Sequence, residues 1–187
     1  MSARVREHAT YEDLLRVPDN MVAELIDGEL FVSPRPRPAH ALATSALGAI
    51  LIPPFQFGDG GPGGWWIIAE PEVHFGPQVL VPDLAGWRVE RMPEMPTGSF
   101  FTVIPDWVCE VLSNPRLDRG KKLPIYARHE VKHAWIVDAE QQYLEVKRLE
   151  NGTWSDVAIF TAGEAVRAEP FDAIEIDMTR VWGPTPA

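Results

Sequence analysis

The chain has 187 residues, of which 27 are acidic and 17 basic, so its formal net charge at pH 7 is −10. Apolar residues make up 45% of the chain, which excludes general disorder. The acidic balance excludes a protein that coats nucleic acid by bulk charge, although it leaves room for a local basic strip. We expect a single domain over residues 1–187, because a chain of this size buries a proper core without disulfides or a structural metal.

Cysteine usage and the first residues favour a cytoplasmic protein. The lone Cys109 has no partner for an internal disulfide, which suits a reducing compartment. The first residues lack the pattern of a signal peptide, and we expect no uncharged apolar run long enough to cross a membrane. No membrane partner is therefore expected.

The first half of the chain predicts two helices and a hairpin. A short helix is expected from the capping residue Thr10 to Val17. Residues 22–26 and 30–33 flank Asp27-Gly28, a dipeptide that suits a tight hairpin turn. Apolar residues near helical spacing predict a helix over residues 38–52, and the two prolines that follow are expected to end it.

The second half predicts several strands, one helix and a C-terminal hairpin. Segments rich in β-branched and aromatic residues indicate strands over 65–69, 72–75, 84–89, 107–112 and 134–137. A helix is expected over 117–128, kinked or delayed by Pro124. Residues 143–149 and 154–160 bracket Asn151-Gly152, a strong hairpin signal. The order predicts an α+β or mixed α/β domain with one central sheet.

Two acidic residues stand out by their apolar surroundings. Asp83 begins an apolar strand, and Glu110 lies inside another, where alternation places it on the same face as Val108 and Leu112. A carboxylate in such surroundings is costly to bury unless it is paired, hydrogen-bonded or bound to a metal. Each alone is also explained as a structural acid that caps an amide or pairs an arginine, so the two are judged together.

A basic strip lies between residues 116 and 132. It contains six basic and two acidic residues, a local balance of +4 in an acidic chain. If the segment is helical, Asp118, Lys122 and Tyr126 follow at i,i+4 steps and share one face. The strip is interpreted either as a solvated helix face or as a contact for a polyanion.

An ordered set of short motifs runs through the chain: ELIDGEL at 24–30, PRPAH at 36–40, VPD at 81–83, CEVLS at 109–113, D-x-x-x-K-x-x-x-Y at 118–126 and AWIVD at 134–138. This set resembles the restriction-endonuclease-like superfamily. Within it, the chain is similar to the large bacterial family of PD-(D/E)XK endonucleases long catalogued as a domain of unknown function. The resemblance spans roughly residues 11–138. It implies a restriction endonuclease-like core, a central mixed β-sheet flanked by helices, with the C-terminal β-hairpin added.

The resemblance also implies a catalytic site. Asp83 and Glu110 match the two motif acids, and Glu24 matches the acid from the N-terminal part, all three as ligands of Mg²⁺ or Mn²⁺. The motif lysine is missing from its standard place two residues after Glu110, so Lys122 takes the role from the following helix, with Lys121 as its rival. The implied function is a metal-dependent endonuclease that hydrolyses phosphodiester bonds of DNA.

The partner expected on these grounds is DNA, bound weakly and in a salt-dependent manner through Arg116, Arg119, Lys121 and His40. A homodimer is left open. The main alternative is a non-catalytic interaction or regulatory protein on the same fold, which the net charge favours somewhat. A distant third is a zinc protease, because residues 129–133 (HEVKH) match H-E-x-x-H, but the segment runs into a predicted strand where that motif needs a helix.

Overall fold

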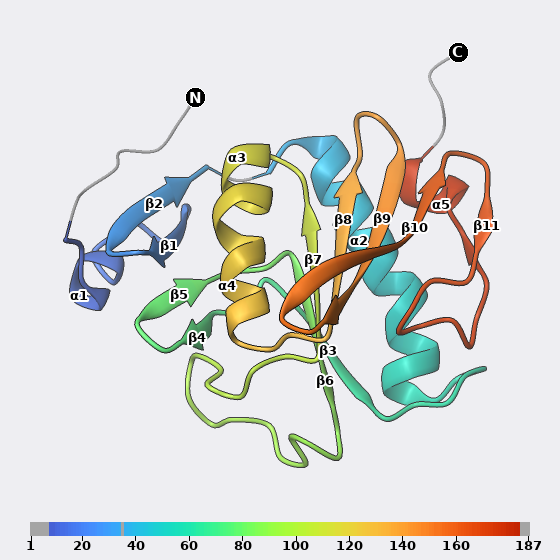
Figure 1. Cartoon of the computed structure of the whole chain (residues 1–187), viewed down its shortest axis with the longest axis horizontal. Helices are drawn as coiled ribbons and strands as arrows, with labels where there is room; N and C mark the ends of the chain where they lie inside the picture. Colours follow the sequence, from blue (N-terminus) through green and yellow to red (C-terminus); the bar gives the residue numbers. More distant parts are fainter. Residues whose placement is uncertain (1–7, 35, 184–187) are drawn as a thin grey trace.

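The computed structural model describes residues 8–34 and 36–183 (Figure 1). Its largest sheet contains, in spatial order, β10 (Thr153–Thr161), β9 (Tyr143–Glu150), β8 (His133–Asp138), β7 (Trp107–Val111), β6 (Leu84–Arg88) and β3 (Trp65–Ala69). Strands β7 and β8 are parallel and the other neighbours are antiparallel. The predicted central mixed sheet is confirmed.

Helices lie on both faces of this sheet (Figure 1). The helical elements are α1 (Tyr11–Leu14), α2 (Pro38–Ile52), α3 (Pro115–Leu117), α4 (Leu123–Arg128), α5 (Thr179–Trp182) and the π-helical turns η1 (Pro53–Phe57) and η2 (Asp118–Lys122). Alternation along β7 separates two cores: Trp107 and Cys109 pack with α2 on one face, and Val108 packs with α4 on the other. The sheet flanked by helices that the sequence predicts is therefore present.

A second sheet lies beside the first and was not predicted. It contains β2 (Glu29–Ser33), β1 (Val22–Ile26), β5 (Gln78–Leu80) and β4 (Val73–Phe75). The predicted hairpin forms its β1–β2 edge, and both Asp27 and Gly28 have the positive φ angles that this tight turn needs. Pairing of β1 with β5 brings the N-terminal strand beside the segment that leads into β6. A third pair, β11 (Ala165–Val166) with β12 (Ile176–Asp177), was also not predicted.

The predicted helix over residues 38–52 is confirmed as α2, which ends at Ile52, but the two prolines that follow do not stop the helical path. The chain passes through Pro53 into η1, whose wider turn is closed by the amide of Gly58 on the carbonyl of Pro53. A proline lacks the N–H for the regular helical hydrogen bond, and a π-helical turn accommodates that loss without ending the helix.

Residues Pro38–Phe57, α2 and η1 together, form a segment long and apolar enough to cross a membrane. The expectation that the chain lacks such an uncharged run was therefore wrong. Ala43, Leu47, Leu51 and Phe55 along this segment are at most 1% exposed and belong to the core against the six-stranded sheet. Burial in that core accounts for these apolar residues, and 33% of the apolar window is buried in all.

Gly86 in β6 lies between two tryptophans, and this close approach predicts a stability effect. A Cβ atom there would lie 3.1 Å from Trp107 and 3.2 Å from Trp65. We expect Gly86→Ala to lower the free energy of unfolding by about 1–3 kcal/mol, because neither ring has room to move in a packed core. Urea unfolding measures this, with Gly98→Ala as control, since a Cβ at Gly98 meets nothing within 4 Å. Equal stability of the two variants would contradict the packing described.

Candidate active site

Two strand ends bring Asp83 and Glu110 together. In the antiparallel pairing of β6 with β7, Leu84 lies opposite Cys109, so one step further along the same register places Asp83 opposite Glu110. Residues opposite one another in such a ladder have Cα atoms about 4.5–5.5 Å apart. Asp83 is also fixed to β7 directly, because its Oδ2 accepts the amide of Val111 at 2.7 Å. The two acids singled out from their apolar context thus share one end of the six-stranded sheet.

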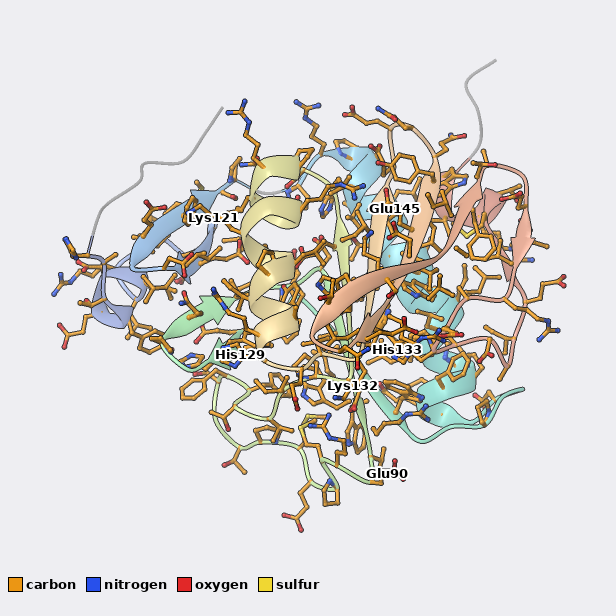
Figure 2. All side chains as sticks on the ribbon, in the orientation of Figure 1. Glu90, Lys121, His129, Lys132, His133 and Glu145 are labelled. Carbon is orange, nitrogen blue, oxygen red and sulfur yellow. The ribbon has the colours of Figure 1, made fainter. Side chains whose placement is uncertain are left out.

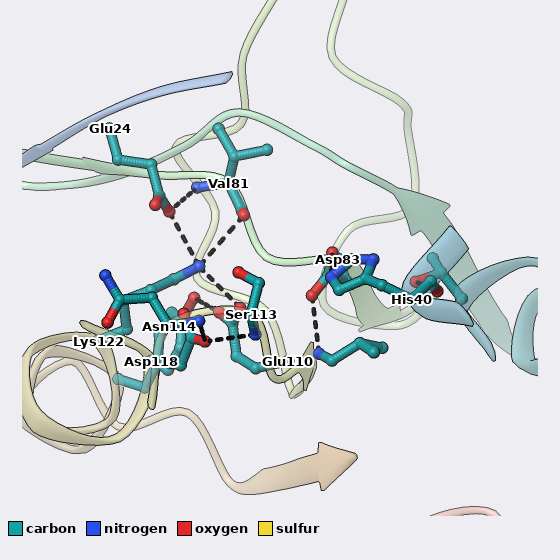
Figure 3. Close-up of polar contacts among 12 residues, drawn as sticks. Glu24, His40, Val81, Asp83, Glu110, Ser113, Asn114, Asp118 and Lys122 are labelled. Carbon is teal, nitrogen blue, oxygen red and sulfur yellow. Dashed lines mark hydrogen bonds and ion pairs between the residues drawn. The ribbon is translucent and has the colours of Figure 1, made fainter. Parts of the chain in front are cut away.

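Lys122 enters this end of the sheet from η2 (Figure 3). Its ammonium is 2.7 Å from Oε2 of Glu110, 2.9 Å from Oε1 of Glu24 and 3.3 Å from the carbonyl oxygen of Val81. Lys122 is 3% exposed and the two carboxylate residues are 2% and 5% exposed. Three sequence-predicted residues therefore form one buried ion cluster, and the backbone of Val81 is a member that the sequence did not indicate.

The charges in this cluster stabilise one another. Burial lowers the pKa of Lys122, but the carboxylates of Glu110 and Glu24 outweigh it and raise the pKa above its ordinary value, so Lys122 is an ammonium. Burial raises the pKa of Glu110 well above its ordinary value, and the positive charge of Lys122 opposes that rise only in part. Tyr126 from α4 adds a hydroxyl that donates to Oε1 of Glu110 at 2.5 Å. Glu110 is thus held by one partner on each oxygen.

Lys121, the rival amine, points elsewhere. Its Nζ is 3.0 Å from Oε2 of Glu29 and lies over the ring of Phe31, on the side of the β1–β2 hairpin. Successive residues of a helical turn leave it in different directions, so Lys122 alone of the two lies in the buried cluster. The geometry separates two candidates that the sequence left open.

His40 in α2 lies next to Asp83. The ring Nε2 is 3.0 Å from Oδ1 of Asp83, and His40 is 8% exposed. Burial lowers the pKa of His40, but the hydrogen bond to Asp83 and the negative charges of Asp83 and Asp118 together outweigh it and raise the pKa above its ordinary value. The other ring nitrogen, Nδ1, is buried and has no hydrogen-bond partner among the described residues. The sequence predicts His40 as a nucleic-acid contact, whereas the structure places it as the neighbour of an acid.

Asp118 fixes the start of the helix that carries Lys122. Its Oδ2 accepts the amides of Ser113 at 3.2 Å and Asn114 at 3.1 Å, just after β7. Burial raises the pKa of this carboxyl, and the charge of Lys122 opposes the rise. The predicted one-face alignment of Asp118, Lys122 and Tyr126 is realised across η2 and α4. The sequence pattern therefore located the helix face without showing that Asp118 anchors it to the strand end.

The basic strip is largely paired with acids. Arg119 donates to both oxygens of Glu145, at 2.8 and 2.7 Å, and to the hydroxyl of Tyr143. Lys121 pairs with Glu29, on the opposite side of the helix from Glu145 (Figure 2). Arg116 is exposed, and no ion pair involves it within the described part of the chain. The local charge excess counted from the sequence is thus reduced in the folded protein.

The ion pair of Arg119 with Glu145 predicts a pH-dependent stability. The hydrogen bonds from Arg119 lower the pKa of Glu145 below its ordinary value of 4.5. A lowered folded-state pKa stabilises the fold above pH 4.5, and this contribution disappears as the pH falls through the folded-state value. We expect Arg119→Met to cost about 1 kcal/mol at pH 7 and clearly less at pH 3 by urea unfolding. A difference from wild type that is equal at both pH values would contradict this linkage.

The H-E-x-x-H segment is not one helix. His129 follows the last residue of α4, Glu130 has a positive φ of 62°, and His133 begins β8 (Figure 2). His133 Nε2 is 3.6 Å from Oε2 of Glu169. Because the chain turns between the two histidines, the helical zinc arrangement of a protease is absent from these residues.

Oxygen donors suited to a divalent cation lie at the Asp83–Glu110 end. Each carboxylate oxygen has one partner, and an ionised carboxylate has about four lone-pair sites, so donor capacity remains. The backbone of Val111 also lies beside His40. No group of three or more His, Cys, Asp or Glu side chains forms a metal cage in residues 8–34 and 36–183. The oxygen donors therefore suit a hard divalent cation held by one or two carboxylates and several waters, rather than by a closed cage.

Two neighbouring strands present acids and the following helix supplies an amine, the arrangement that the resemblance implies, and the comparisons support a restriction endonuclease-like protein. The model of the Uma2 family, described as "Putative restriction endonuclease", matches residues 9–179, and the chain belongs to this family. A solved structure, described as "a putative nuclease belonging to DUF820" from Anabaena variabilis ATCC 29413, is similar with 20% identity and a TM-score of 0.70. The match covers 93% of this chain and 97% of that one. The comparison with curated proteins gives no match.

Proposed function

We propose that this protein hydrolyses phosphodiester bonds of DNA with Mg²⁺ or Mn²⁺, and that it acts in the cytoplasm. The observation that carries the proposal is the meeting of Asp83, Glu110 and the Lys122 ammonium at one end of the six-stranded sheet. A chain of the Uma2 family with this arrangement has the acids and the amine that phosphodiester hydrolysis needs.

The acids and the residues around them have different proposed roles. Asp83 and Glu110 would hold the cation through their remaining lone pairs, with His40 and the Val111 amide orienting Asp83. When bound, the metal lowers the pKa of a coordinated water and offsets the negative charge that gathers on the phosphate. Lys122 opposes the rise that burial causes in the pKa of Glu110, and its ammonium lies where it can orient the attacking oxygen or stabilise the same developing charge.

DNA binding is proposed to be weak and salt-dependent. The chain carries a net charge of −10, and Arg119 and Lys121 are paired with acids in the folded protein. Exposed Arg116 is the strip residue best placed for a phosphate contact, and the metal would supply part of the attraction. Few phosphate contacts give a modest affinity at physiological salt, and these electrostatic contacts weaken further as the salt concentration rises.

Plasmid nicking tests the proposal. Purified protein is expected to convert supercoiled plasmid to the open circle with Mn²⁺ or Mg²⁺ and to stop when EDTA is added. Glu110→Gln is expected to abolish nicking, whereas Glu94→Gln, in the exposed loop between β6 and β7, is expected to retain it. A wild type that stays inert with every divalent metal and shows no calorimetric metal binding would favour the non-catalytic interaction protein instead.

A further inference from the structure

Glu24 reaches the cluster from a different sheet than the other two acids. It lies on β1 of the four-stranded sheet, whereas Asp83 and Glu110 lie at the end of the six-stranded sheet. Its Oε1 accepts the amide of Val81 at 2.9 Å and forms an ion pair with the ammonium of Lys122 at 2.9 Å. The carboxylate is therefore fixed by the backbone on one side and by the amine on the other (Figure 3).

The contacts of the Lys122 ammonium indicate the role of Glu24. An ammonium has three N–H donors, and Glu110, Glu24 and the Val81 carbonyl are three acceptors within reach. Two of these three acceptors come from the four-stranded sheet: Glu24 lies on β1, and Val81 directly follows β5. The amide of Val81 donates a hydrogen bond to Glu24. If Glu110 turns its oxygen toward a cation, these two still hold the amine, and one N–H becomes available to the reacting groups.

The same geometry disfavours direct contact between Glu24 and a metal at Asp83 and Glu110. The ammonium of Lys122 lies between Glu24 and Glu110. A metal ion in contact with Glu24 would lie close to this ammonium, and the two positive charges would repel each other in a site that is nearly closed to water. A bond to that metal from Oε1 of Glu24, the oxygen that pairs with Lys122 and accepts the Val81 amide, would displace the buried Lys122 ammonium. Removing one partner from a buried ion pair is strongly destabilising, so this exchange is unfavourable.

We propose that Glu24 is a positioning residue that holds the Lys122 ammonium in the active site and is not a ligand of the metal. This assignment differs from the role that the family resemblance implies for Glu24, and its metal part rests on the proposed function. It makes the four-stranded sheet a support for the catalytic amine.

Calorimetric titration with Mn²⁺ tests the metal part. The Kd of Glu24→Gln is expected to stay within about threefold of wild type, whereas Asp83→Asn is expected to weaken binding at least about tenfold. At saturating Mn²⁺, Glu24→Gln is expected to lower kcat at least about tenfold with an unchanged KM for plasmid, because the amine is misplaced and substrate binding is not. A Glu24→Gln variant that loses Mn²⁺ affinity as strongly as Asp83→Asn would overturn the proposal.

A double-mutant cycle tests the Glu24–Lys122 link without metal or activity. Glu24→Gln is expected to lower the melting temperature in the wild-type background, and to leave it unchanged or raise it in a Lys122→Met background. Glu29→Gln, which removes the partner of the more exposed Lys121, serves as the matched control and is expected to shift the melting temperature equally in both backgrounds. Additive shifts for Glu24 would overturn the positioning role. If the wild type binds no Mn²⁺, the proposed function fails, and the cycle alone decides the role of Glu24.

Discussion

Lys122→Met is expected to reduce plasmid nicking at least about a hundredfold and to lower the free energy of unfolding by about 3–5 kcal/mol. The activity falls because the ammonium is the sole side-chain cation that hydrogen-bonds Glu110 among the described residues. The stability falls because Glu110 and Glu24 are left as buried carboxylates without their counter-charge. Methionine fills a volume similar to that of lysine, so the loss of unfolding free energy reflects the missing charge more than a change in packing.

Nicking rates and urea unfolding of the same preparations measure both effects, and Lys121→Met is the matched control. Lys121 is the next residue in the chain and pairs with the half-exposed Glu29, so its replacement is expected to cost less than about 1 kcal/mol and to retain activity. If Lys121→Met removed activity while Lys122→Met kept it, the assignment of the amine would be wrong.

Asp83→Asn is expected to weaken Mn²⁺ binding about tenfold to a hundredfold and to abolish nicking, with a small effect on stability. Asparagine keeps an oxygen that can accept the Val111 amide, so the β6–β7 contact survives, whereas the charge beside His40 is lost. Calorimetric titration and urea unfolding separate the two effects.

Asp106→Asn is the matched control for Asp83→Asn. Asp106 is also nearly buried and accepts a backbone amide at a strand end, that of Arg88 at 2.8 Å, but it pairs with Arg91 away from the cluster. It is expected to lose some stability and to bind Mn²⁺ as wild type does. Wild-type Mn²⁺ affinity in Asp83→Asn would remove Asp83 from the metal site.

Local sequence signals predicted most of the six-stranded sheet and the two acids at its end. Burying an acid inside an apolar strand costs free energy unless a partner stabilises it. Asp83 and Glu110 could therefore be recognised as candidate site residues from the sequence without knowledge of their partners. The Asp27-Gly28 and Asn151-Gly152 turns were visible because their backbone angles restrict the residue types.

Contacts between distant parts of the chain were not predictable in this way. The bond from the Val81 amide to Glu24 spans 57 residues, and that from Lys122 to the Val81 carbonyl spans 41. Neither contact produces a periodic pattern in the sequence. The four-stranded sheet and its support of Lys122 are therefore known only from the structure. Charge counting also identified the basic strip without showing that Glu145 and Glu29, far along the chain, pair with it.

A crystal soaked in Mn²⁺ tests the central claim most directly, because anomalous scattering at the manganese edge locates the ion independently of activity. The arrangement described predicts one strong peak in contact with the carboxylates of Asp83 and Glu110, with the Lys122 ammonium still bound to Glu24. A soaked crystal with no peak at that end of the sheet, or with its peak on carboxylates elsewhere, would contradict a catalytic metal centre at these residues.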